Sequence, residues 1–518
     1  MVIPYVPSMK DMTPVDQQTF VLGSLLPISL LKYLKKLMIP VFFPNCSSVY
    51  RLFMPDEVVL RFPKYTFQHL KPYSKFMEIY PNWHEQPYRQ DFFTYAMDYF
   101  GHKPTVGVVL RQEDNTLLAI RGFDKPRLLP NNPEFEYAKK LTIQYLERYC
   151  SKVYPRYSDL RLTYNKSSSF PLNTHFPLKE DIPEEIFDLL LSSPLGDNYF
   201  KLSMKREKLP LTKIVDKHKM RSFMMSDVQL LMFEKIFSED FNEFIKIIPM
   251  SAYGHSHHYR GFDKLANKIN CFTHKVEYDV KLWDKSFPLK RTVREIRKKF
   301  LILDPEEEEL FDAISDIYDS PKVILPWGEV YVFHNGQFSG SEDTTTDNII
   351  GHFIIKFYEL ICGCLAKYDE YPTLSDIFLH YTGVFYGDDA LESHDDFYDF
   401  VSDGNHKNFI FQQFGMGIDP TDPEKWKSST DLDGMTFLGM EFRTFRDVWV
   451  PHFDFNKVLD TICVDEDTFS KEQRAHTYVQ MLQLLIYNPN YKKFRTYILD
   501  YCKTFAVEIP GCPTQEEA

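Results

Sequence analysis

Carboxylate side chains occur at separate places along the chain with types and spacings suited to holding metal ions. The first pair begins at the end of a predicted short strand and continues into a turn, and the last pair lies between two apolar stretches, as in a β-hairpin. Between them, a loop of small and polar residues leads into a predicted helix. The three patterns are Asp279-x4-Asp284, Ser339-Gly340-x3-Thr344-x3-Asn348 and Gly387-Asp388-Asp389.

The carboxylates suit phosphoryl transfer to a ribose hydroxyl. Two divalent ions held close together activate the attacking hydroxyl and neutralise the triphosphate. Mg²⁺ prefers hard oxygen ligands and keeps several waters, so two or three carboxylates suffice. A strand-end aspartate facing a hairpin-turn aspartate would place these ligands on one small surface. We therefore expect Asp279 and Asp388 to be the principal ligands of two Mg²⁺ ions, with Mn²⁺ as a substitute, and Asp389 to be an accessory ligand.

Positive charge is concentrated in one segment of an otherwise acidic chain. The formal net charge is −13, which argues weakly against nucleic-acid binding, but net charge does not describe a local groove. Residues 201–221 contain eight basic and two acidic side chains. Such a run is either a solvated charged face or a pair of strands that binds phosphates.

These patterns together resemble the polymerase motifs of positive-strand RNA viruses, with the closest likeness to astrovirus and picornavirus-like polymerases. Thr344 to Asn348, Tyr386 to Asp389 and Gly261-Phe262 have an astrovirus-like character. In chain order, the resemblance covers motif F (Lys205 to Arg221), motif A (Asp279 to Asp284), motif B (Ser339 to Asn348), motif C (Tyr386 to Asp389), motif D (Gly415 to Ile418, then Lys425) and motif E (Phe437 to Gly439).

The resemblance implies a role for each matching residue. Basic residues would bind the incoming triphosphate, polar residues around the ribose 2′-hydroxyl would select NTPs over dNTPs, and a lysine would protonate the pyrophosphate leaving group. Gly340 would let the loop backbone approach the template or nucleotide. The residues expected to bind the triphosphate are Lys205, Arg206, Lys219 and Arg221, and those expected around the ribose are Asp284, Ser339, Gly340, Thr344 and Asn348. The expected proton donor is Lys425, with Lys427 nearly as good a match. The primer grip would be Phe437, Leu438 and Gly439.

The implied fold is α+β, a closed right hand of fingers, palm and thumb, with a small antiparallel palm sheet backed by helices. The first 180 residues carry no matching motif, so their assignment rests on analogy. The expected parts are fingers at 1–275 with an N-terminal bridge to the thumb, palm at 276–285, a fingers insertion at 286–335, palm at 336–440 and thumb at 441–518.

Local patterns predict the elements that would position the motifs. An apolar stripe predicts a helix from about Thr344 to Cys362, behind the palm sheet. The segment from Phe20 to Leu31 predicts an amphipathic helix that covers the core or, alternatively, binds a membrane surface or a partner. Other expected helices lie at 135–149, at 290–313 and through most of the last 70 residues, and other strands at 106–110, 117–120 and 435–450.

Expected partners are an RNA template, its product duplex and NTPs. The resemblance adds a genome-linked protein primer and other viral replication proteins. The eight cysteines are scattered, which favours reduced thiols in a cytosolic setting. No uninterrupted apolar run is as long as a membrane span, so at most peripheral membrane association is expected. The expected location is the host cytoplasm, at membrane-associated replication complexes.

Two alternative functions stay open at this stage. A reverse transcriptase shares the aspartate turn, although Asp284 with Asn348 favours ribose recognition and therefore RNA synthesis. A catalytically inactive polymerase fold could bind RNA or act as a scaffold, although all the expected metal ligands are present. A zinc site at His255, His257 and His258 is disfavoured because no cysteine or second ligand pair lies nearby.

Overall fold

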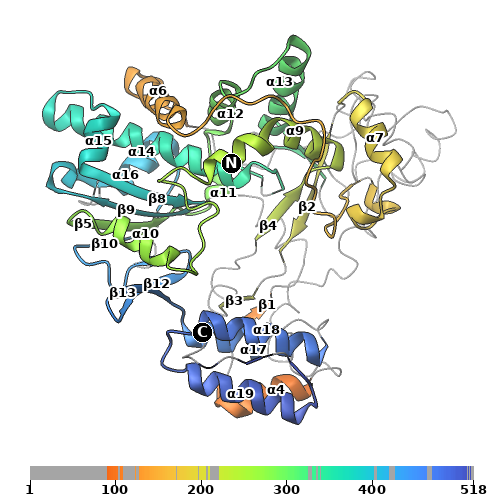
Figure 1. Ribbon diagram of the computed structural model, residues 1–518. Coiled ribbons are helices and arrows are strands. Elements are labelled where there is room, and N and C mark those ends of the chain that lie inside the picture. Colours follow the sequence, from red (N-terminus) through yellow and green to blue (C-terminus); the bar gives the residue numbers. More distant parts are fainter. Residues whose placement is uncertain are drawn as a thin grey trace, which may run out of the picture.

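A computed structural model shows the arrangement of the chain (Figure 1). It describes residues 90–102, 105–108, 123, 128–170, 172–195, 198–205, 208–210, 221–324, 330–333, 336–338, 340–401, 405–418, 426–463, 470–509, 511–512 and 514. Some expectations lie outside these residues, namely the strand at 117–120, the helix from Phe20 to Leu31, and Arg206, Lys219, Ser339 and Lys425.

A four-stranded antiparallel sheet carries the three aspartates. Its strands lie in the order β10 (Trp426–Ser429), β5 (His274–Asp279), β9 (Asp389–His394) and β8 (Tyr381–Tyr386). The strand expected before Asp279 and the two strands expected around Asp388 are therefore present.

Side chains on both faces of this sheet are buried at its two hairpin strands, β8 and β9. Val384 and Leu391 are paired and pack into the cluster that contains helix α10 (Gly261–Ile269). Phe385 and Ala390, the next pair, join the larger cluster around helix α14 (Thr344–Tyr368). Residues that alternate along each strand thus serve two different cores.

Helix α14 is the central helix of the larger core. By length and composition it could cross a membrane, but 78% of its most apolar window is buried inside the protein, as in a core helix. It continues to Tyr368, beyond the expected end at Cys362. Gly363 lies inside the helix. A Cβ atom at this position would lie 2.2 Å from the ring of Phe400, so the glycine makes room for that ring. The helix ends where Asp369 adopts a left-handed conformation (φ 59°).

A second sheet lies beside the first (Figure 1), with strands in the order β4, β2, β6 and β7. β2 pairs antiparallel with β4 and parallel with β6. Helices α9 and α13 pack on this sheet, and α12 packs on α14. The bounds are β2 (Tyr199–Met204), β4 (Ser222–Met225), β6 (Lys322–Ile324), β7 (Val330–Val332), α9 (Val228–Ile245), α12 (Lys290–Lys298) and α13 (Pro305–Asp319).

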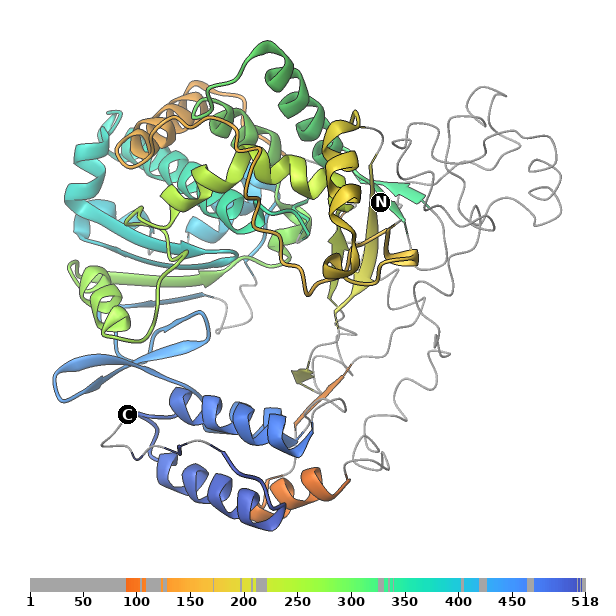
Figure 2. The ribbon, with the colours of Figure 1, turned by 45° about the vertical axis from the view of Figure 1, so that its right-hand side comes forward.

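The C-terminal helices pack against α4 (Gln90–Phe100), as both ribbon views show (Figures 1 and 2). Tyr95 stacks on Tyr497 at 5.7 Å, and Phe100 lies 4.8 Å from the same ring. Strand β1 (Val106–Val108), a few residues further on, pairs with β3 (Lys208–Pro210). The described residues between 90 and 108 therefore contact both the C-terminal helices and β3, which lies within the basic segment. These helices are α17 (Phe455–Cys463), α18 (Lys471–Leu484) and α19 (Tyr491–Thr504).

The expected helices at 135–149 and 290–313 and the strands at 435–450 are all found. The first is α6 (Pro133–Glu147), which packs on α14. The other described elements are α7 (Glu184–Ser192), α11 (Trp283–Ser286), α15 (Leu374–His380), α16 (Asn405–Phe414), β11 (Thr436–Phe437), β12 (Met440–Phe445), β13 (Val448–His452) and the 3-10 helices η7 (Leu172–Thr174), η8 (Lys179–Asp181) and η9 (Asp396–Val401).

Candidate active site

The three aspartates meet at one end of the central sheet. Asp279 is the last residue of β5 and lies directly opposite Asp389, the first residue of β9. Asp388 precedes it in a two-residue turn whose first residue, Gly387, has φ +62°. A turn of this kind needs a residue that tolerates positive φ, which is why glycine occupies the position. The strand end and the hairpin turn thus bring together carboxylates that are more than a hundred residues apart.

The carboxylates repel one another. Burial and the charge of Asp388 raise the pKa of Asp389 to about 7, and Glu277 contributes in the same direction. A divalent cation is the natural partner for such negative charge, and carboxylate oxygens are suitable ligands for Mg²⁺. With the side chains as they stand, the described residues contain no group of three or more His, Cys, Asp or Glu that could hold a metal ion. The carboxylates therefore suit Mg²⁺ by their charge and their oxygen atoms, although their side chains are not arranged as a complete metal-binding site.

Two described residues of the basic segment, Lys205 and Arg221, act electrostatically on Asp284 in the motif A turn. Lys205 and Arg221 flank the paired strands β2 and β4, and the Lys205 amide donates to the Arg221 carbonyl at 2.8 Å. Burial raises the pKa of Asp284, the charges of Lys285, Arg221 and Lys205 lower it, and the charge of Asp388 raises it further. Positive charge from the motif F segment thus acts on the motif A turn, next to motif C. The phosphate-binding role of this segment stays a prediction.

Asn348 and Thr344 lie on the first two turns of α14. Asn348 is buried, and its Oδ1 atom has no hydrogen-bond partner among the described residues. An unsatisfied buried oxygen is costly unless a ligand pairs with it, so Asn348 is suited to binding a hydroxyl group. The Thr344 hydroxyl lies 2.7 Å from the carbonyl of Phe338 and 2.9 Å from that of Ser341, so it stabilises its own loop.

Gly340 allows a close backbone approach, but within the protein. A Cβ atom at this position would lie 1.9 Å from the carbonyl oxygen of Met224 on β4. Ser226 also donates its hydroxyl to the Gly340 carbonyl at 3.0 Å. The glycine is therefore needed to place the motif B loop against the strand that follows the basic segment, a role that the sequence did not reveal.

The motif D segment is joined to motif A through the backbone. The Lys281 amide donates to the Gly417 carbonyl at 2.7 Å. Lys427 lies on β10 opposite Glu277, and its Nζ donates to the Gly434 carbonyl at 2.7 Å. Because Lys425 lies outside the described residues, the choice between the two lysines stays a prediction.

The motif E residues form the turn between β11 and β12. Phe437 is buried, while Leu438 and Gly439 have φ of +53° and +73°. A leucine in the left-handed region is uncommon, and such conformations often occur at functional sites. Leu438 is 36% exposed at this turn, and the primer-grip role of the motif stays a prediction.

Sequence reasoning missed a buried network of charges below the motif B loop. Arg297 on α12 donates to Asp347 on α14 at 2.5 Å and to Asn242 on α9 at 2.9 Å. Arg294, one turn before, donates to Glu234 on α9 at 2.7 Å. The available signal was the high density of charge in the 290–313 segment, within which Arg294 and Arg297 are buried.

Glu234 carries this network into the loop. Its carboxylate accepts hydrogen bonds from the Ser341 hydroxyl at 2.6 Å and from the Glu342 amide at 2.8 Å. The Tyr318 hydroxyl is a third donor, at 2.7 Å. Burial and the charge of Asp343 raise the pKa of Glu234 to about 7, although Arg294 and the hydroxyl donors of Ser341 and Tyr318 act in the opposite direction. The loop that leads into α14 is therefore fixed by a buried acceptor.

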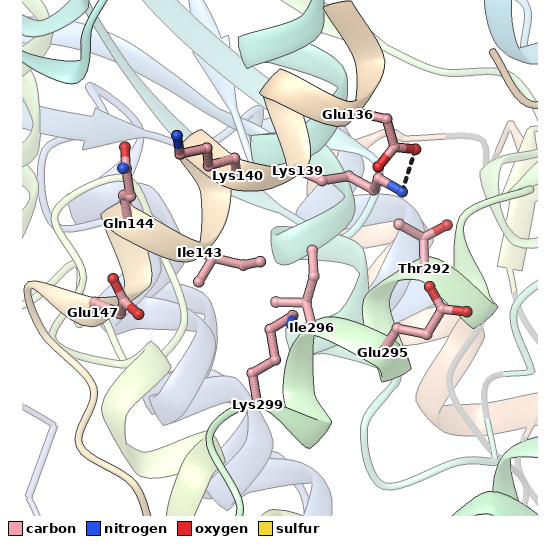
Figure 3. Close-up of a pocket in the computed structure, with 10 residues that line it drawn as sticks. All are labelled: Glu136, Lys139, Lys140, Ile143, Gln144, Glu147, Thr292, Glu295, Ile296 and Lys299. Atoms are coloured by element: carbon pink, nitrogen blue, oxygen red, sulfur yellow. Dashed lines mark ion pairs between the residues drawn. The ribbon is translucent and has the colours of Figure 1, made fainter. Parts of the chain in front are cut away.

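Other features of the surface do not add a site. The described residues, which include His255, His257 and His258, contain no group that could hold zinc. A groove of about 550 Å³ lies between α6 and α12. Figure 3 shows the side chains that line it. Its rim carries both charge signs, including the ion pair of Lys139 with Glu136 at 2.5 Å, and none of the aspartates lines it.

A small sheet that carries carboxylates at adjacent strand ends, with basic residues acting on the turn beside them, is the arrangement of a nucleotidyl-transferring polymerase. A family model described as viral RNA-dependent RNA polymerase matches residues 193–504, well over half of the chain. The chain therefore belongs to this family and is an RNA-directed RNA polymerase.

Curated relatives agree with the expected astrovirus-like character. The non-structural polyprotein 1AB of Turkey astrovirus 1 is 24% identical over 269 residues, which cover 50% of this chain and 16% of the polyprotein. The corresponding polyprotein of Ovine astrovirus 1 is 27% identical over 317 residues, covering 58% of this chain and 22% of the polyprotein. The chain thus spans about a fifth of the length of these relatives.

A solved structure establishes the fold. The Sicinivirus 3Dpol RNA dependent RNA polymerase has a TM-score of 0.63 at 15% identity, and the match covers 82% of this chain and 92% of that chain. The chain therefore has the α+β right-hand polymerase fold.

Proposed function

We propose that this chain copies a viral RNA genome by template-directed transfer of nucleoside monophosphates from NTPs to an RNA 3′-hydroxyl, with two Mg²⁺ ions. The observation that carries the proposal is the meeting of Asp279, Asp388 and Asp389 at one end of the central sheet. Asp279 and Asp388 would be the principal ligands and Asp389 an accessory one. When bound, the ions activate the 3′-hydroxyl and neutralise the leaving pyrophosphate.

The chain's own side chains would bind and orient the nucleotide. Lys205 and Arg221 compensate the charge of the triphosphate, and Arg221 can do so through two parallel hydrogen bonds. Asn348 offers an unpaired amide oxygen to a ribose hydroxyl. Pairing with the 2′-hydroxyl disfavours a deoxynucleotide, which would leave that oxygen unpaired. This favours RNA synthesis over the activity of a reverse transcriptase.

The division of the chain also belongs to the proposal. The central sheet with α14 would be the palm, the sheet of β2 and β4 with α9 and α13 part of the fingers, and the helices from α17 onward the thumb. Residues 90–108 would then bridge the fingers and the thumb, since they contact both the C-terminal helices and β3. Further proposed partners are a genome-linked protein primer and other viral replication proteins, at membrane-associated complexes in the host cytoplasm.

Incorporation of labelled NTPs on a homopolymer RNA template tests the proposal. The wild-type protein should incorporate the complementary NTP in a Mg²⁺-dependent reaction, and Asp388→Ala should not. Asp396→Asn, an exposed carboxylate at the other end of the sheet, is the matched control and should be as active as wild type. Equal incorporation by wild type and Asp388→Ala would reject the proposal in favour of an inactive RNA-binding fold.

A further inference from the structure

His352 lies one helical turn after Asn348 on α14, and its Nε2 atom is 3.0 Å from the carbonyl oxygen of Gly387. A carbonyl group can only accept a hydrogen bond, so Nε2 carries the proton and donates. Its side chain is buried. The Gly387 carbonyl belongs to the peptide bond that joins Gly387 to Asp388. The hydrogen bond therefore fixes the orientation of that peptide plane from the helix side.

The imidazole ring is held flat between two aromatic rings. Trp283 stacks on one face with centroids 4.1 Å apart and an angle of 17°. Phe385 stacks on the other face at 4.8 Å and 12°. Trp283 is the residue before Asp284, and Phe385 lies on the strand that leads into the turn. One column of rings thus joins motif A, the motif B helix and motif C.

The column continues to a glycine on α14. Phe287 stacks on Trp283 at 5.3 Å, and a Cβ atom at Gly351 would lie 2.5 Å from the Phe287 ring. The Trp283 Nε1 atom is buried and has no hydrogen-bond partner among the described residues, so Trp283 contributes its ring face and not its N–H group. The imidazole is the polar member of this stack and the one that reaches the turn.

The turn needs such support because one side of it has no packing neighbour and because the carboxylates around it repel one another. A Cβ atom at Gly387 would have no neighbour within 4 Å, so that side of the turn is open. Asp388 is exposed and repels both Asp284 and Asp389. A donor fixed from the buried side opposes displacement of the turn by this repulsion.

We infer that His352 is a positioning residue, which holds the Gly387–Asp388 turn in place relative to Asp279 and Asp284 through its Nε2–H donor. The inference rests on the proposed function for its effect on catalysis. A reacting group misplaced by about 1 Å can cost about a hundredfold in rate, so loss of a single tether should have a clear effect.

His352→Phe keeps a ring in the stack and removes the donor, whereas His352→Gln keeps an amide donor and loses the aromatic stack. We expect His352→Phe to lower kcat about tenfold, to raise the Mg²⁺ concentration for half-maximal activity and to leave the KM for NTP unchanged. His352→Gln should recover most of the lost kcat. His380→Phe is the matched control, because His380 also stacks on a ring, Phe397 at 4.5 Å, and bonds Asp395 at 2.7 Å, but at the opposite end of β8. It should behave as wild type.

A measurement without metal or substrate separates this inference from the proposed function. Hydrogen exchange of the peptide covering residues 381–394 should be faster in His352→Phe than in wild type and His352→Gln, at an equal melting temperature. Exchange and Mg²⁺ dependence unchanged in His352→Phe would overturn the inference. So would equal losses of kcat and melting temperature in both His352 variants, which would reveal a packing role. If Asp388→Ala is fully active, the proposed function fails, while the exchange result still decides the role of His352.

Discussion

Asp279 and Asp389 face each other as a directly paired couple across β5 and β9. This pairing fixes the strand-end carboxylate of motif A against the hairpin of motif C. Asp388 lies one residue earlier, in the exposed turn. The register therefore distinguishes two neighbouring aspartates, one held in the sheet and one projecting from its end.

The first prediction concerns this difference between the aspartates. Asp388→Asn or Asp279→Asn should lower NTP incorporation about a thousandfold, because each removes a principal charge that opposes the metal ions. Asp389→Asn should cost only about 10- to 100-fold, the usual effect of a supporting ligand. Steady-state incorporation with Mg²⁺ and with Mn²⁺ measures both effects. Equal losses for Asp388→Asn and Asp389→Asn would contradict the assigned ranking.

The second prediction concerns the sugar of the nucleotide. Asn348→Ala should lower the preference for UTP over dUTP roughly tenfold, about the worth of one lost hydrogen bond, mainly through poorer use of UTP. Competition between labelled UTP and dUTP on one template measures the ratio. Asn267→Ala, an exposed amide on α10, should leave the ratio unchanged. An unchanged ratio in Asn348→Ala would mean that its free oxygen does not meet the ribose.

Much of this architecture follows from local sequence patterns. The strand ending at Asp279, the hairpin around Gly387 and the start of α14 were all predicted, because period and turn residues act over short stretches. The family and the fold class were recognised from the motif order. Residues 1–89 and Lys425 lie outside the described structure, so the expectations for them stay predictions.

Long-range contacts could not be predicted in the same way. Gly340 has a tight neighbour on β4, and Gly363 has one in the ring of Phe400, both far away in sequence. Arg297 looks like a surface charge in its own helix, yet it is buried against Asp347. His352 has no motif of its own. Each of these roles depends on which elements the fold brings together, and no local pattern encodes that.

The third prediction tests the buried network below motif B. Arg297→Met should lower the free energy of unfolding by about 3–5 kcal/mol, because it leaves the buried charge of Asp347 without its partner. Lys298→Met, which removes the exposed pair with Asp312, should cost less than about 1 kcal/mol. Urea unfolding followed by circular dichroism gives both values. Similar midpoints for the two variants would show that the buried pair does not hold the helix.

The fourth prediction concerns pH and Lys268 on α10. Its Nζ donates to the carbonyls of Gly383, at 3.0 Å, and Pro249, and burial lowers its pKa from 10.5 to about 8. Between pH 8 and 10.5 the unfolded chain therefore holds a proton at this lysine that the folded protein has lost. Stability from this group must rise with pH across that window, since the unfolded state binds more protons there.

Unfolding of metal-free protein between pH 7.5 and 10.5 tests this sign. The free energy of unfolding of wild type minus that of Lys268→Met should increase with pH and level off near 10.5. Lys264→Met, an exposed lysine on the same helix, provides the control, and its difference from wild type should stay flat. A difference for Lys268→Met that is flat, or that falls as pH rises, would mean that Lys268 keeps its proton in the folded protein. The carbonyls of Pro249 and Gly383 would then stabilise an ammonium group, and α10 would be tied to β8 by a charged donor instead of a neutral one.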